Sequence, residues 1–248
     1  MNMPGADSGP APRLGIAEND PVRRRIERLM PGLADAIAPR ARRFASRSAR
    51  PRREIVHEGD MPSGLWVLRS GWAAHVRHFA DGRRQIQHLL LPGDPLPLDR
   101  GGPYPATIMA LNAATVIDLD GLWLGEPAGL DEMVRRHGRE SIRYLLGAIA
   151  RLGRQSAIER FAHLLLELRD RLLAIGLAST TRFDLPLTQE MLADTLGLTS
   201  VHVNRTLQAM RQQGLIELAG RKVTLLRAEE LAGLADYTSP MVPAQDIG

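Results

Sequence analysis

Residues 185–226 read LPLTQEMLADTLGLTSVHVNRTLQAMRQQGLIELAGRKVTLL, and this stretch carries the strongest structural signal in the chain. Thr188 is suited to cap a short amphipathic helix. Gly197 follows that helix, at a position where glycine adopts a left-handed backbone without steric penalty. Ser200 then starts a second helix, and two short strands are expected around Gly220. Helix, glycine turn, helix and hairpin in this order predict a winged helix-turn-helix.

The second helix of this motif has an apolar seam and a mixed outer face. At about 100° per residue, Val203 and Leu207 lie on the seam, whereas Val201, Arg205 and Gln208 lie on the other side. A helix of this size enters the major groove, where an arginine can bridge guanine O6 and N7 and a valine can contact a thymine methyl. The residues predicted to contact DNA are Thr188, Gln189, Thr199, Ser200, Val201, His202, Asn204, Arg205, Gln208 and Arg221. The alternative, a helix-turn-helix used only for packing, is disfavoured by this polar face together with a basic hairpin tip.

Upstream, from about residue 55 to 119, the sequence changes to short apolar or alternating runs. Turn residues separate these runs at intervals of about 10 to 12 residues. They are Gly59-Asp60, Ser70-Gly71, Asp81-Gly82 and Gly93-Asp94. This spacing predicts a small antiparallel roll or barrel, with Asp81-Gly82 as a hairpin turn.

Between the roll and the C-terminal motif the apolar period becomes helical. Ile142, Leu145, Ile149 and Leu152 are spaced by 3, 4 and 3 residues, which is a narrow seam that suits a coiled-coil partner. The seam predicts pairing with a second copy of the chain, with packing on the chain's own roll as the alternative. A second amphipathic helix follows and ends at Gly176, and TTRFDLP is interpreted as a linker.

The composition is that of an ordinary globular protein, with 44% hydrophobic and 24% charged residues among 248. Lys222 is the only lysine, so 31 of the 32 basic residues are arginine. GC-rich coding and a phosphate-bearing partner both explain that bias. The sequence contains no cysteine, which excludes disulfides and cysteine-held metal clusters. No apolar run approaches a membrane span, so a cytoplasmic protein is expected.

These patterns predict an α+β chain with an N-terminal antiparallel β-roll, a long dimerisation helix and a C-terminal winged helix-turn-helix. The predicted divisions are a disordered tail (1–20), a roll with a preceding helix from Pro21 (21–129), a dimerisation helix (130–157), a DNA-binding domain (158–237) and a flexible tail (238–248).

The segment LPLTQEMLADTLGLTSVHVNRTLQAMRQQGLI closely resembles the helix-turn-helix of the Crp/Fnr family of bacterial transcription regulators, named for the cyclic-AMP receptor protein. The resemblance covers about residues 22–237. IVHEGD, GLWVLRSG and LLPGD resemble the family's β-roll, a double-stranded β-helix of the cyclic-nucleotide-binding type, and RQSAIERFAHLLLEL resembles the end of its dimer helix. The resemblance implies a homodimer that binds a two-fold symmetric site in double-stranded DNA and contacts RNA polymerase.

Two departures from the family pattern affect function. Members that bind cyclic AMP carry a Gly-Glu pair for the ribose and a later Arg-Ser or Arg-Thr pair for the phosphate. Here Asp94 is followed by Pro-Leu-Pro-Leu, and the second pair falls near Pro105-Ala106. A buried phosphate without a counter-charge is strongly unfavourable, so cyclic AMP is not expected as the effector. Ser200-Val201 also replaces the family's Arg-Glu or Val-Glu pair, so that glutamate's contact with cytosine is not carried over.

Histidines in the roll raise two alternative functions. His75 and His78 are three residues apart on a predicted strand, which places them on opposite faces, so they cannot chelate one metal ion together. A haem or small-molecule sensor that acts through protein contacts is the alternative function, although residues 95–98, where carbon-monoxide-sensing members hold haem, lend it no support. A cupin-like metalloenzyme is a third hypothesis, but no residue spacing indicates catalysis, and neither a metal site nor an enzyme is expected.

Overall fold

A computed structural model describes residues 17, 19–38, 45–98, 101–119 and 128–239 of the chain. The predicted tails, 1–20 and 238–248, lie mostly outside the described residues. The chain divides into two compact units. The first contains the residues up to His75 together with Leu89–Arg139, and the second contains Val76–His88 together with the chain from Glu140 onward.

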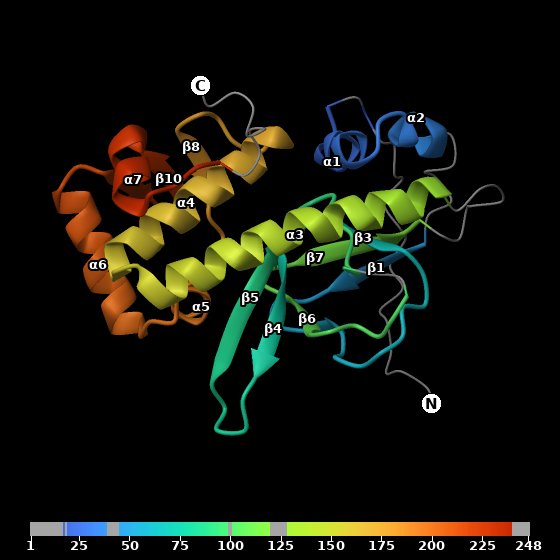
Figure 1. Cartoon of the computed structure of the whole chain (residues 1–248), viewed down its shortest axis with the longest axis horizontal. Coiled ribbons are helices and arrows are strands. Elements are labelled where there is room, and N and C mark those ends of the chain that lie inside the picture. Colours follow the sequence, from blue (N-terminus) through green and yellow to red (C-terminus); the bar gives the residue numbers. More distant parts are fainter. Residues whose placement is uncertain (1–16, 18, 39–44, 99–100, 120–127, 240–248) are drawn as a thin grey trace. The chain divides into compact units, whose positions relative to one another are not determined.

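The predicted roll is confirmed as an antiparallel β structure built from two sheets (Figure 1). One sheet has the order β1-β7-β3 and the other β2-β6-β4-β5. The strands are β1 (Ser46–Ala49), β2 (Glu54–Val56), β3 (Trp66–Ser70), β4 (Ala73–His78), β5 (Arg84–Leu90), β6 (Thr107–Ala110) and β7 (Ala114–Asp118). A glycine with positive φ occupies each of the four predicted turns, namely Gly59, Gly71, Gly82 and Gly93. Glycine adopts this conformation readily, so the turn pattern was a reliable signal.

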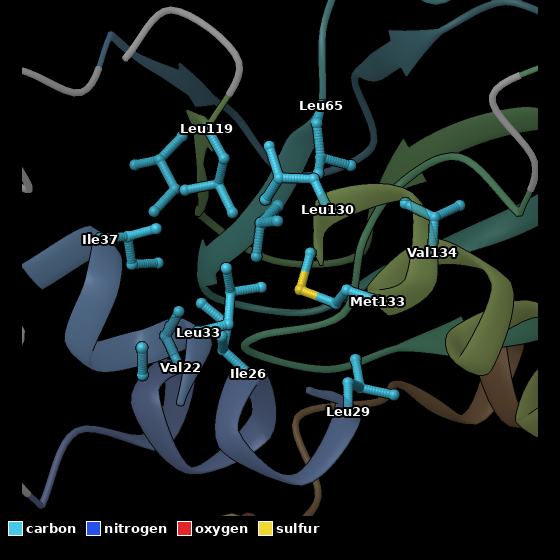
Figure 2. Packing of buried hydrophobic residues seen from close by; sticks show 13 residues of the cluster. Val22, Ile26, Leu29, Leu33, Ile37, Leu65, Leu119, Leu130, Met133 and Val134 are labelled. Carbon is cyan, nitrogen blue, oxygen red and sulfur yellow. The ribbon is translucent and has the colours of Figure 1, made fainter. Parts of the chain in front are cut away.

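Helices α1 (Pro21–Leu29) and α2 (Leu33–Ile37) belong to the first unit and cover an apolar cluster of the roll (Figure 2). The Asp20 carboxylate caps α1 by accepting from the Val22 amide at 2.9 Å. Ile26 and Leu29, on the same helix face as Val22, are buried against Leu65, Met133 and other members of the cluster. The helix predicted from Pro21 is therefore part of the hydrophobic core of this unit.

Two long helices follow the roll. Helix α3 (Ala128–Arg154) begins in the first unit and ends in the second, and α4 (Ala157–Ala174) lies in the second. A capping box starts α4, because the Ser156 amide donates to Glu159 at 2.7 Å while the Ser156 side chain accepts from the first turn. Both helices were predicted, and the break between them falls at residues 155–156. Among the residues that the structure describes, no helix is long and apolar enough to cross a membrane.

The C-terminal part has the predicted winged helix-turn-helix architecture. Its elements are α5 (Gln189–Leu196), α6 (Ser200–Gln212), β9 (Ile216–Ala219) and β10 (Lys222–Leu225). An additional helix, α7 (Ala228–Ala235), packs on α4. The interpretation of TTRFDLP as a linker was wrong. Its central residues form β8 (Arg182–Asp184), which pairs with β10 in a sheet of order β8-β10-β9. Phe183 is buried in this strand, but three alternating residues are too few to reveal a strand in the sequence.

Candidate nucleic-acid interface

Helix α5 begins and ends as the sequence predicts. The Thr188 hydroxyl accepts from the Met191 amide at 3.2 Å and so caps the helix N-terminus. At the other end Gly197 has φ of 62° and its amide donates to the Ala193 carbonyl. A Cβ atom at Gly197 would also lie 3.3 Å from the Leu152 side chain. The left-handed backbone therefore favours glycine, and a larger residue would also press on the Leu152 side chain.

An arginine that sequence reasoning missed supports the turn after α5. Arg160 on α4 donates through Nη1 to the Leu196 carbonyl at 2.9 Å and through Nε to the Gln155 carbonyl at 2.8 Å. A guanidinium at a helix C-terminus satisfies an orphan carbonyl and interacts favourably with the helix dipole. One side chain thus links the start of α4 to the end of α5. Arg160 lies 36 residues before Leu196, and no local pattern marks such a pair.

Helix α6 presents two faces, as predicted. The Thr199 hydroxyl accepts from the His202 amide at 3.2 Å and caps the helix. The buried face consists of Val203, Thr206, Leu207 and Met210. The predicted contact residues on the helix, namely Ser200, Val201, His202, Asn204, Arg205 and Gln208, are all exposed, and Val201 has 69% of its surface accessible. The apolar side chain of Val201 is thus exposed to solvent among polar side chains.

Two further predicted contact regions are also exposed. Thr188 and Gln189 lie at the N-terminus of α5, where free backbone N–H groups favour anions. Arg221 and Lys222 follow Gly220 in the hairpin between β9 and β10. The Leu185 amide donates to the Arg221 carbonyl at 2.6 Å, which holds the hairpin on the segment leading into α5. The described surface therefore offers an exposed helix face, a helix N-terminus and a basic hairpin.

Part of the predicted dimer seam on α3 lies on a free surface. Ile142 and Ile149 are 56% and 67% exposed, but Leu145 and Leu152 are half-buried within their own chain. Leu146 is 60% exposed instead. The exposed stripe therefore follows Ile142, Leu146 and Ile149, at intervals of four and three residues. It is shifted from the predicted seam because the other side of α3 is already covered within the chain.

A buried tyrosine lies beside the position where a cyclic-nucleotide phosphate would be expected. Tyr104, next to Pro105 and Ala106, is 4% exposed and lies in an apolar cluster with Leu96 and Ile108. Burial raises the pKa of Tyr104 to about 12, which outweighs the opposing effect of Arg47. The phenol therefore stays neutral and contributes no charge to the roll.

The two histidines of β4 lie in different surroundings. His75 is buried and His78 is exposed. Burial lowers the pKa of His75 to about 4, and the weaker opposing effect comes from Asp94. Within the described ranges, no group of three or more histidine and acidic side chains is placed to hold a metal ion.

Comparison with known proteins gives two matching family profiles. Residues 46–121 match the cyclic nucleotide-binding domain, and residues 159–234 match the Crp-like helix-turn-helix domain.

Three relatives show similarity over most of the chain. The nitrogen fixation regulation protein FixK of Bradyrhizobium diazoefficiens is 32% identical over 188 residues, which cover 73% of this chain and 78% of FixK. The transcriptional activator protein FnrL of Cereibacter sphaeroides is 32% identical over 189 residues, which cover 71% of this chain and 74% of FnrL. The solved structure of FixK2 from Bradyrhizobium japonicum superimposes with a TM-score of 0.67 at 29% identity, over 79% of this chain and 99% of FixK2. By their names, the two curated relatives are regulators rather than enzymes.

Proposed function

The chain belongs to the Crp/Fnr family of transcription regulators, and from that premise we propose that it acts as a homodimer that reads a two-fold symmetric DNA site with α6. The single observation that carries this proposal is the exposed face of α6, on which Val201 stands 69% accessible beside Arg205 and Gln208. Contact with a base pair would remove the apolar surface of this side chain from water, which is favourable.

Each exposed group of the motif has a role in this proposal. Arg205 bridges O6 and N7 of a guanine, and Asn204 and Gln208 have the amide geometry for adenine or phosphate. The methyl groups of Val201 contact the C5-methyl of a thymine, a contact that the glutamate common in the family cannot make. His202, Ser200 and Thr199 flank this face at the helix N-terminus.

Phosphate contacts orient the motif on the duplex. Thr188 and Gln189 meet the backbone at the N-terminus of α5, and Arg221 follows the backbone from the hairpin. Such contacts carry no sequence information, but they set the register of α6 in the groove.

The proposed dimer forms through the exposed stripe Ile142, Leu146 and Ile149 on α3. An isologous pairing of two α3 helices removes these side chains from water and generates the two-fold axis that a palindromic site requires. The proposed roles divide the chain into 21–129 for sensing, 130–157 for dimerisation and 158–237 for DNA binding, in a cytoplasmic protein that contacts RNA polymerase. Residues 76–88 are an exception, because they belong to the same compact unit as the DNA-binding helices.

We further propose that the roll does not take a cyclic nucleotide in the family's usual mode. Pro105 and Ala106 offer neither a cation nor a hydroxyl, and Tyr104 occupies the adjoining core. Asp94 cannot act as a free acceptor for a ribose, because its carboxylate accepts from Arg25 Nε at 2.7 Å and from the Leu91 amide at 2.9 Å.

The test is selection of bound sequences from a random DNA library, followed by titration of the enriched site at several salt concentrations. The expected site has two inverted half-sites whose centres are about 10 base pairs apart, and log K falls steeply with log salt. Arg205→Ala should retain salt-dependent binding and lose roughly 1–3 kcal/mol of discrimination per half-site. A flat salt slope, or no enrichment, would contradict DNA reading and favour a sensor that acts through protein contacts.

A further inference from the structure

The hairpin formed by β4 and β5 contacts the helix-turn-helix through one arginine. Arg84, on β5, donates through Nε to Asp194 Oδ2 at 2.8 Å, and its Nη2 atom also bonds to the same oxygen. A further contact joins Nη2 to Glu190 Oε1 at 3.5 Å. Both acidic residues lie on α5, and all three residues belong to the second compact unit.

The ion pair is largely shielded from water. The side chains of Arg84 and Asp194 are 15% and 18% exposed. Charge-assisted hydrogen bonds in such a setting are stronger than exposed surface pairs, and their loss leaves a partly buried charge. Arg84 therefore restrains the position of α5.

The base of the same hairpin is also attached to the long helices. The His88 ring stacks on Tyr144 of α3 with ring centroids 6.1 Å apart. On the Tyr144 ring lies the guanidinium of Arg171 from α4, 4.6 Å from the centroid. The hairpin is thus held at its base by Tyr144 of α3, whose ring also contacts Arg171 of α4, and it is bonded through Arg84 to α5.

We propose that Arg84 is a positioning residue for DNA recognition, an inference that rests on the proposed DNA-binding function. Glu190 and Asp194 are four residues apart and share one face of α5, whereas Gln189 lies about 100° away from Glu190 around the helix. Arg84 therefore engages α5 without covering its phosphate-facing N-terminus. The reading face of α6 also stays exposed while the Arg84–Asp194 pair is formed. The paired form therefore leaves the α6 face accessible to DNA.

The positive charge of Arg84 also favours DNA binding. Glu190 is in the first turn of α5, next to the predicted phosphate contact of Gln189. Two carboxylates on this helix would repel the DNA backbone, and the adjacent guanidinium offsets their charge. Removal of Arg84 therefore loosens α5 and exposes uncompensated negative charge beside the duplex.

The experiment compares Arg84→Ala with the matched control Arg83→Ala in the full-length chain, on the enriched DNA site. Arg83 is the neighbouring arginine of the same hairpin, 78% exposed and paired with Asp81. We expect Arg84→Ala to weaken binding roughly tenfold and Arg83→Ala to bind like the wild type. The charge-reversed pair Arg84→Glu with Asp194→Arg should recover most of the lost affinity, which a role of Arg84 in folding alone does not predict.

The salt dependence separates positioning from direct contact. A residue that grips a phosphate lowers the slope of log K against log salt by about one unit when it is removed, as expected for Arg221→Ala. Arg84→Ala should change that slope by clearly less than one unit, because Arg84 contacts no phosphate. A slope lowered by a full unit, wild-type affinity in Arg84→Ala, or no recovery in the reversed pair overturns the positioning role alone. A wild-type protein that selects no DNA overturns the proposed function itself.

Discussion

Arg25 Nε donates to Asp94 Oδ1 across 2.7 Å, and both side chains are buried. This pair joins α1 to the loop that follows β5. The two backbones approach so closely there that a Cβ atom at Gly93 would lie 2.3 Å from that of Arg25. An arginine of the N-terminal helix thus balances the charge of an acidic residue 69 positions away.

Arg25→Ala is expected to destabilise the protein by about 3–5 kcal/mol, because it leaves the Asp94 carboxylate buried without its guanidinium. The free energy of unfolding is measured by urea denaturation of the full chain. Arg24→Ala, one position earlier and exposed, is the control and should change stability by less than about 0.5 kcal/mol. A loss below about 1 kcal/mol in Arg25→Ala would show that the pair contributes little.

Val201→Glu is expected to change the preferred half-site. A carboxylate at this position accepts from cytosine N4, whereas the valine contacts a thymine methyl, so selection should move from an A·T pair to a C·G pair. The measurement is selection from the same random library with both proteins. Unchanged base preference would mean that Val201 does not read DNA.

Ile149→Asp is expected to convert the proposed dimer into monomers, because it places a charge in the exposed stripe on α3. Sedimentation equilibrium gives the oligomeric state. Met61→Asp is a suitable control, since Met61 is a comparably exposed apolar residue outside α3, at 65% accessibility. A dimeric mass for both proteins would place the dimer contact elsewhere, and a monomeric mass for the wild type would contradict the proposed dimer.

Cyclic AMP and cyclic GMP are both expected to bind no better than millimolar, because the roll lacks the counter-charge for a buried phosphate. Isothermal titration calorimetry of the purified protein checks this directly. A dissociation constant in the micromolar range for either nucleotide would overturn the proposal for the roll.

Stability is expected to fall as the pH drops from about 6.5 to about 4, through His75. Burial lowers its pKa in the folded protein to about 4, whereas the unfolded chain takes up the proton near 6.5. The unfolded state therefore binds more protons in this window, and stability rises with pH by on the order of 3 kcal/mol in total. Urea denaturation across this range should show a weaker dependence in His75→Phe, but not in the exposed control His78→Gln. An equal slope in His75→Phe would assign the effect to other groups.

Local signals predicted the DNA-reading motif well. The caps at Thr188 and Gly197 and the exposure of Val201 follow from residue types a few positions apart, and the structure has them as expected. The roll was also predictable, because each turn needs a residue that tolerates positive φ and the sequence places glycine there.

Features that depend on distant contacts were missed. On α3, Leu146 is exposed whereas Leu145 is half-buried, because the covered side of a long helix is set by what packs on it and not by its own period. Strand β8 is too short to be distinguished from a linker. The Arg84–Asp194 pair spans 110 residues, and nothing beside either residue in the sequence indicates its partner.

The single lysine lies on the hairpin proposed to follow the DNA backbone. Lys222 is exposed at the start of β10, and the other basic residues are all arginine. An enzyme or reagent that modifies lysine side chains therefore has one target position in this sequence. Acetylation there removes one positive charge from the wing and nowhere else. An amine-reactive dye would, apart from the chain's own amino terminus, attach at that same place.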